Sequence, residues 1–152
     1  MGGDYTAGAL AYTRRCVNAA NVAIIGNEGS TITGQRTVGG VISDIQMNGG
    51  LKANYSNFSA SGLTITAAKM HVGGISGIIA GQTLDGATVE NVTIVCDDVR
   101  KGIVAGSLGE VSTIKNITVN NVNGATNIVG ATFDTGSDVV VNGDVYDSVA
   151  NN

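Results

Sequence analysis

The chain carries glycine-punctuated apolar segments that recur along its length. The clearest is VGGISGIIAG, from Val72 to Gly81, which is too apolar for a loop and too rich in glycine for a helix or an ordinary strand. Similar segments are VGGVISD at residues 38–44, TAGALAYT at 6–13, GIVAGSLG at 102–109 and NIVGATF at 127–133. Such an internal repeat predicts an architecture in which each unit packs on its neighbours.

A second series of short segments begins with Asn, or with Asp in its last copy. These are NVAII, NFSAS, NVTIV, NITVN and DVVVN, which start at residues 21, 57, 91, 116 and 138. The first and third residues after the Asn are apolar or small in every copy, and a period of two predicts a strand with one buried face. We expect the leading apolar residues to form one ladder inside the fold: Val22, Phe58, Val92, Ile117 and Val139.

A third element, STITG at 30–34 and LTITA at 63–67, follows the first two Asn-led segments. We interpret DDVRKG as its remnant in the third copy, so the repeat shortens along the chain. Shortening favours an irregular coil over a propeller with equal blades. The Thr-Ile-Thr pattern is similar to the threonine arrays of ice-binding solenoids, but two copies give only a short array.

These elements together predict an all-β fold, a right-handed parallel β-helix (β-solenoid) of about five coils. Glycine makes up 23 of 152 residues, about twice the usual share of roughly 7%. Where a coil bends sharply, the backbone needs a positive φ or a residue without a side chain, and Gly73, Gly74, Gly77 and Gly81 are expected there. A phosphate-binding loop is the alternative, but no Gly-Lys-Ser/Thr follows. We expect residues 1–152 to form a single solenoid domain that belongs to a longer chain or to an assembly.

The leading asparagines are expected at the corners of the coil. Asn91 and Asn116 should lie one above the other, with their amides bonded to each other or to the backbone. Both also begin Asn-x-Ser/Thr sequons, as do Asn54 and Asn57. Glycan attachment is therefore the alternative interpretation in a eukaryotic secreted protein.

Composition and charge exclude several classes of protein. The net charge is −4 and the basic residues are scattered, which argues against nucleic-acid binding. No apolar run approaches the roughly 20 residues of a membrane span. The opening MGGDYTAGAL lacks a basic start followed by an apolar stretch, so we expect no signal peptide within this segment, which leaves export of the protein open.

The sequence predicts no metal ion and no cofactor. Its two cysteines and single histidine are too few for an ordinary zinc site. Cys16 and Cys96 lie far apart along the chain, and we expect two separate thiols, with a disulfide as the alternative. His71 begins a glycine segment and is interpreted as a turn or edge residue, so we assign no catalytic residue.

One dense charged cluster, CDDVRK at residues 96–101, is the candidate for chemistry. Asp97 and Asp98 could act as the acidic residues of a carbohydrate-cleaving β-helix. Adjacent residues on a strand point to opposite faces, however, so a solvated turn between coils is the favoured interpretation. The six Tyr and Phe residues form no clear row of the kind that sugar-binding clefts use.

The stretch VGGISGIIAGQTLDGATVENVTI resembles the GLUG repeat, which has an apolar-Gly-Gly start and an Asn-centred strand, and KGIVAGSLGEVSTIKNITV is similar without the paired glycines. The resemblance implies an extracellular or cell-surface β-solenoid of bacterial surface or secreted proteins, including adhesin-like ones, and carries over no catalytic residue. We therefore expect a non-enzymatic structural or adhesive module that can assemble end to end. Its expected partners are copies of itself, neighbouring solenoid coils, a surface glycan or a protein ligand. The alternative is a carbohydrate-active or phage tailspike-type β-helix.

Overall fold

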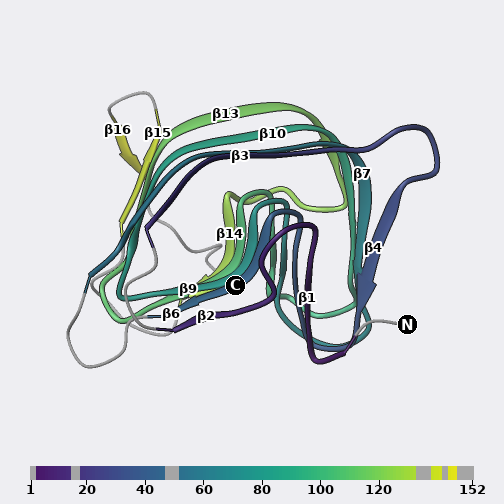
Figure 1. Ribbon diagram of the computed structural model, residues 1–152, viewed down its shortest axis with the longest axis horizontal. Coiled ribbons are helices and arrows are strands. Elements are labelled where there is room, and N and C mark those ends of the chain that lie inside the picture. The colour runs from purple at the N-terminus through teal and green to yellow at the C-terminus, as the bar shows by residue number, and fades with distance from the viewer. Residues whose placement is uncertain (1–2, 15–17, 47–51, 133–137, 142–143, 147–152) are drawn as a thin grey trace.

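The computed structural model describes residues 3–14, 18–46, 52–132, 138–141 and 144–146. These residues form a parallel β-solenoid of about four turns, and no helix occurs among them. Figure 1 shows successive coils lying one behind the other, with equivalent strands in register. The five glycine segments lie at equivalent positions and bound about four turns, one fewer than the expected five coils.

Each coil contributes strands to three sheets, which we name A, B and C. Sheet A contains the short strands that enter each glycine segment: β1 (Tyr5–Ala7), β5 (Thr37–Gly39), β8 (Val72–Gly73) and β11 (Lys101–Gly102). Sheet B contains the strands that leave it: β2 (Thr13–Arg14), β6 (Ile42–Gln46), β9 (Ser76–Ala80), β12 (Ala105–Gly109) and β14 (Val129–Thr132).

Sheet C is the long outer wall of the solenoid (Figure 1). It contains β3 (Ala19–Ile25), β4 (Thr31–Gly34), β7 (Asn54–Ala67), β10 (Thr83–Val95), β13 (Thr113–Asn123), β15 (Asp138–Val141) and β16 (Asp144–Tyr146). All strand pairs in the three sheets are parallel except β15 with β16. We refer to β1–β4 as coil 1, β5–β7 as coil 2, β8–β10 as coil 3 and β11–β13 as coil 4.

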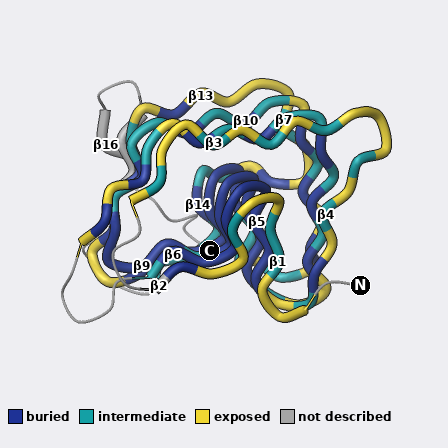
Figure 2. Tube along the Cα trace, in the orientation of Figure 1, coloured by how far each residue is buried: buried dark blue, intermediate teal, exposed yellow. Residues whose placement is uncertain are grey.

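The glycine segments fold inward and form the centre of the coil. Figure 2 shows this inner fold as buried, and residues 37–45 and 71–77 are buried throughout. A Cβ atom at Gly73 would overlap the carbonyl oxygens of Ser76 and Val104, so the chain reverses there only without a side chain. Gly81 instead has a φ of 69°, a conformation that side chains disfavour. Both expected reasons for the glycines therefore occur, at different positions.

The inward positions of sheet C stack in register from coil to coil. Val22 pairs with Phe58, Phe58 with Ala87, and Ala87 with Ile117. Phe58 is 1% exposed and Ile117 is 6% exposed, whereas Val22 on the first coil is half-buried. The ladder thus includes Ala87, which the Asn-led pattern did not select.

Two members of the expected ladder belong elsewhere. Val92 is buried but pairs with Leu63 and Val122, one corner further along the coil. Val139 pairs with Ile114, and its side chain lies outside the described part of the chain. The prediction that five residues form a single ladder is therefore wrong for Val92 and Val139.

The cause lies in the backbone conformation at the two corners of sheet C. A residue at each corner has a positive φ, which Asn and Gly both tolerate better than other residues. Asn21, Asn57, Gly86 and Asn116 occupy the first corner, and Gly62, Asn91 and Asn121 occupy the second. Because Gly replaces Asn at either corner, aligning the copies on Asn alone assigned Asn91 to the wrong corner.

The predicted stacking of Asn91 on Asn116 is therefore wrong, although amide ladders do form. Asn121 Nδ2 donates to Asn91 Oδ1 at 2.8 Å, and Asn57 Nδ2 donates to Asn21 Oδ1 at 3.0 Å. Asn116 Nδ2 donates to Asp85 Oδ1 at 2.6 Å. All these amides are exposed, so the cost of burying an unpaired amide does not apply to them.

The corner geometry predicts an unusual order of stability for variants of Asn91. Asn91→Ala should lower the free energy of unfolding by about 1–2 kcal/mol, because Ala lacks the short polar side chain that lets Asn tolerate a φ of 52°. Asn91→Gly should cost less than Asn91→Ala, since Gly62 already occupies this corner in coil 2. Urea unfolding of the three proteins measures the order, and equal losses for Ala and Gly would contradict the backbone explanation.

The third element also continues further than the sequence indicated. Thr93 pairs with Thr64, and Thr64 with Thr31, so residues 92–95 are its third copy and DDVRKG is not. The stacked threonines form two columns. The first contains Thr31, Thr64 and Thr93 and ends at Asn123 of coil 4. The second contains Thr33 and Thr66 and ends at Val95 of coil 3. The threonine array is thus three coils long in one column and two in the other.

Candidate functional site

The inward fold of each glycine segment creates a notch between sheets A and B. Because the chain reverses within the segment, residues that precede it and residues that follow it can come together at the notch. In coil 1 these residues are Tyr5 and Tyr12, whose ring centroids lie 5.0 Å apart. Further along, His71 of coil 3 meets Ser107 of coil 4.

The two tyrosines at the notch are both accessible. Tyr5 is 47% exposed and Tyr12 is 36% exposed, and their ring planes are inclined at 47°. The Tyr12 hydroxyl makes a long hydrogen bond of 3.4 Å to Gln46 Oε1. Gln46 Nε2 in turn donates to Asp44 Oδ2 at 3.0 Å, and Asp44 is fully buried. A buried carboxylate thus orients the amide that contacts an exposed tyrosine.

A small depression of about 130 Å³ opens beside Tyr5. Asp4 and Arg36 place one carboxylate and one guanidinium at it, and Arg36 Nη2 lies 3.4 Å from Met70 Sδ. The depression therefore offers hydrogen-bond donors and acceptors with no net charge. Its lining is Asp4, Tyr5, Arg36, Thr37, Met70, His71 and Ile78.

A buried polar contact beside the notch joins His71 and Ser107. The distance from Nδ1 to Oγ is 2.7 Å, and the residues are 6% and 0% exposed. A serine nucleophile beside a histidine base is the arrangement of acyl-transfer enzymes. A substrate cannot reach a hydroxyl with no exposed surface, so this pair links coils 3 and 4. His71 lies in the connection between β7 and β8, as expected of a turn residue, but it is buried and bridges two coils.

Burial, with a smaller effect from Arg100, lowers the pKa of His71 to about 4. In the unfolded chain the imidazole titrates near 6.5, so between pH 6.5 and 4 the unfolded state binds more protons. The free energy of unfolding is therefore not reduced by His71 above pH 6.5, and it falls as the pH decreases from 6.5 toward 4.

We expect the free energy of unfolding to fall by up to about 3 kcal/mol across that window because of His71. Urea titrations at pH 7.5, 6, 5 and 4.5 measure the loss. His71→Gln should be less stable than the wild type at pH 7.5 but should lose much less stability on acidification. A variant with the same pH dependence as the wild type would contradict this explanation.

The charged cluster at 96–101 forms an internal ion pair. Both carboxylate oxygens of Asp98 accept from the Arg100 guanidinium, at 2.7 Å from Nε and 2.6 Å from Nη2. This contact lowers the pKa of Asp98 to about 2. Asp97 next to it is exposed. Asp98 is therefore an ionised carboxylate engaged with Arg100 and is poorly suited to act as a general acid.

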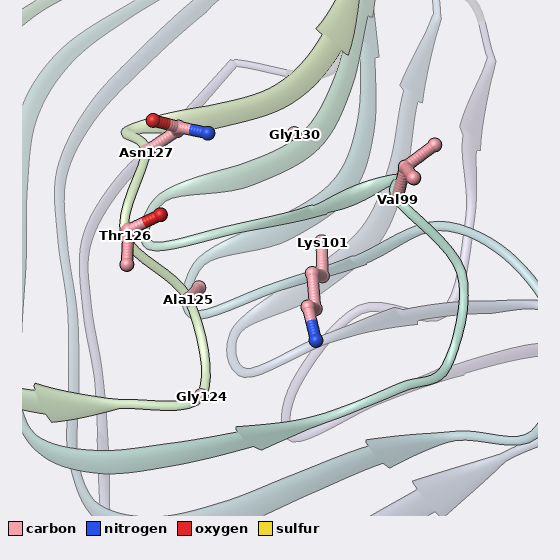
Figure 3. A pocket seen from close by; sticks show the side chains of 7 residues that line it. All are labelled: Val99, Lys101, Gly124, Ala125, Thr126, Asn127 and Gly130. Carbon is pink, nitrogen blue, oxygen red and sulfur yellow. The ribbon is translucent and has the colours of Figure 1, made fainter. Parts of the chain in front are cut away.

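The larger depression, of about 420 Å³, lies beside the same loop (Figure 3). It arises because β13 ends at Asn123 while β10 runs on to Val95, so the chain after Gly124 takes a shorter path than the coil before it. Lys101 Nζ donates to the Cys96 carbonyl at 3.1 Å. The lining is Val99, Lys101, Gly124, Ala125, Thr126, Asn127 and Gly130, which includes no aromatic ring and no carboxylate.

The cysteines do not form the alternative disulfide. Cys96 is a free, buried thiol whose Sγ donates to the Met70 carbonyl at 3.2 Å, and burial raises its pKa. Cys16 lies outside the described residues.

Within the described ranges, no group of three or more His, Cys, Asp or Glu side chains could hold a metal ion. No helix in the described part of the chain is long and apolar enough to cross a membrane.

The contact between Tyr5 and Tyr12 was not predicted from the sequence. Four of the chain's aromatic residues are tyrosines, and these two are separated by the first glycine segment. Once the segment is understood as a reversal of the chain, residues on either side of it are expected to lie opposite one another. In coil 2 the equivalent positions are Thr37, which pairs with Tyr5, and Asp44, which precedes the partner of Thr13.

Comparison with known proteins gives no relative for this chain. No family model matches it, no curated protein matches it, and no solved structure matches it. The β-solenoid fold therefore stands on the strand pairing alone, and the GLUG relationship stays a prediction.

Proposed function

We propose that the chain is a non-enzymatic extracellular module with a structural or adhesive role, able to assemble end to end. The observation that carries the proposal is the position of coil 1 in the sheets. Its strands β1, β2 and β3 are the terminal strands of sheets A, B and C. Terminal strands present backbone groups to which another chain, or a preceding part of the same protein, can add.

Two further features support a structural role. Exposed polar side chains bond along the solenoid axis, for example Asn120 Nδ2 to Glu90 Oε1 at 3.0 Å. Lys115 Nζ and Asp85 Oδ2 form an ion pair of 3.0 Å on the same wall. The surface of sheet C thus uses its polar groups to link coils, and the resemblance to the GLUG repeat supports a location at the bacterial surface.

Sedimentation velocity of the purified protein over a wide concentration range tests the assembly. We expect larger species that grow with concentration, because contacts between different ends need not close into a ring. A species that stays monomeric at every concentration would remove the end-to-end assembly from the proposal.

Turnover tests the alternative of a carbohydrate-active or tailspike-type enzyme. The purified protein should release no reducing ends from polysaccharides such as pectate or bacterial capsule. Release that is lost in Asp97→Ala or Asp98→Ala would overturn the non-enzymatic proposal. We expect both variants to sediment like the wild-type protein at every concentration.

A further inference from the structure

We propose that the mouth of the notch in coil 1 is a saccharide-binding site, in which a neutral pyranose ring stacks on the Tyr5–Tyr12 pair. This inference rests on the proposed adhesive function and names the ligand class for it. The site consists of Tyr5, Tyr12 and the adjoining depression with Asp4 and Arg36.

The first argument is the geometry of the aromatic pair. The two rings lie against each other at a centroid distance of 5.0 Å and an angle of 47°, and each tyrosine residue keeps more than a third of its surface accessible. The face of an aromatic ring carries negative partial charge. The axial C–H bonds of a pyranose with equatorial hydroxyls carry positive partial charge on a flat apolar face. Such a sugar therefore matches an exposed tyrosine face in both shape and charge.

The second argument is the polar support behind Tyr12. A fully buried carboxylate is costly unless hydrogen bonds compensate for its lost hydration. Asp44 occupies a position at which the following coils have Ile78 and Ser107, so the fold itself does not require an acid there. The Asp44 carboxylate accepts from Gln46, and Gln46 contacts the Tyr12 hydroxyl. This chain of contacts restrains an exposed side chain, and restraint before binding lowers the entropy cost of binding.

The third argument is the charge of the adjoining depression. Asp4 supplies acceptors and Arg36 supplies donors, so sugar hydroxyls can bond to both. The two charges cancel, which favours a neutral sugar over an acidic one. The larger depression beside Lys101 lacks an aromatic ring and is the poorer candidate for this ligand.

Binding of cellohexaose and chitohexaose, measured by titration calorimetry and tyrosine fluorescence, tests the proposal. Tyrosine emission is usable because the chain has four Tyr and no Trp. We expect saturable binding by the wild-type protein, weakened by roughly tenfold or more in Tyr5→Ala and in Tyr12→Ala. Tyr12→Phe keeps the ring and should bind within a fewfold of the wild type. Ile25→Ala, at a residue that is 78% exposed on the same coil, is the matched control and should bind normally.

Three results would overturn the proposal. One is the absence of binding of both oligosaccharides at millimolar concentration by the folded wild-type protein. Another is unchanged affinity in the two alanine variants when their circular dichroism matches the wild type. The third is loss of self-association in these variants with sugar binding unaltered, which would make the tyrosines an assembly contact. Failure of sugar binding leaves the sedimentation and turnover results intact, so it is distinguishable from failure of the proposed function.

Discussion

Val92→Asp should leave the chain without a cooperatively folded state. Val92 is 1% exposed and stacks between Leu63 and Val122 on the inner face of sheet C. A carboxylate there must either lose its hydration or take up a proton, and a pKa raised from about 4 to above 7 costs about 4 kcal/mol. Loss of apolar contacts adds to this cost, and the sum approaches the 5–15 kcal/mol that stabilises a typical domain.

The neighbouring residue provides a control with the same new charge. Thr93 follows Val92 on β10 and points to the opposite, outer face of the sheet. Thr93→Asp should therefore keep the wild-type circular dichroism spectrum and lose less than about 1 kcal/mol. Thermal unfolding of both variants separates the two faces. A folded Val92→Asp protein with a melting temperature near the wild type would show that the assigned buried face is wrong.

Strand existence and buried faces could be predicted because both depend on local alternation. Phe58 and Ile117 follow corner asparagines and pack inside the coil, as an alternating strand requires. Register between coils could not be predicted from the same pattern, because it depends on which corner each Asn or Gly occupies. Gly86 and Asn57 share one corner, and Gly62 and Asn91 share the other, although the residue types differ. A pattern based on residue identity fails where two residue types satisfy the same backbone requirement.

The candidate site was harder to predict because it depends on a chain reversal. Tyr5 and Tyr12 meet only because the first glycine segment turns back on itself, and no strand period brings them together. His71 and Ser107 come from different coils and are 36 residues apart, so their contact depends on the register as well. Asp97 and Asp98 were visible as a charged run, but the pairing of Asp98 with Arg100 depends on how the turn folds. Residue types therefore indicated where charge lies, and the fold decided which groups meet.

Gly73→Ala should be among the most damaging changes of a single methyl group. The added Cβ would overlap the carbonyl oxygens of Ser76 and Val104 and would lie 2.7 Å from the Cα of Ala105. All three are backbone atoms of coils 3 and 4, so no side-chain rotation can relieve the overlap. Crowding in a well-packed core usually costs 1–3 kcal/mol. Because the overlapping atoms here belong to the backbone of two coils, we expect a loss of at least about 3 kcal/mol, with a melting temperature lower by roughly 10 °C.

Gly3→Ala adds the same methyl group where no atom lies within 4 Å, and its φ is outside the positive range. That variant should remain within about 0.5 kcal/mol of the wild type. Differential scanning calorimetry of both variants at one concentration measures the contrast and keeps any self-association equal. Equal melting temperatures for Gly73→Ala and Gly3→Ala would mean that the inner fold can widen to admit a side chain. In that case close approach of the backbone would no longer explain why glycine recurs in these segments, and positive φ at positions such as Gly81 would be the only remaining explanation.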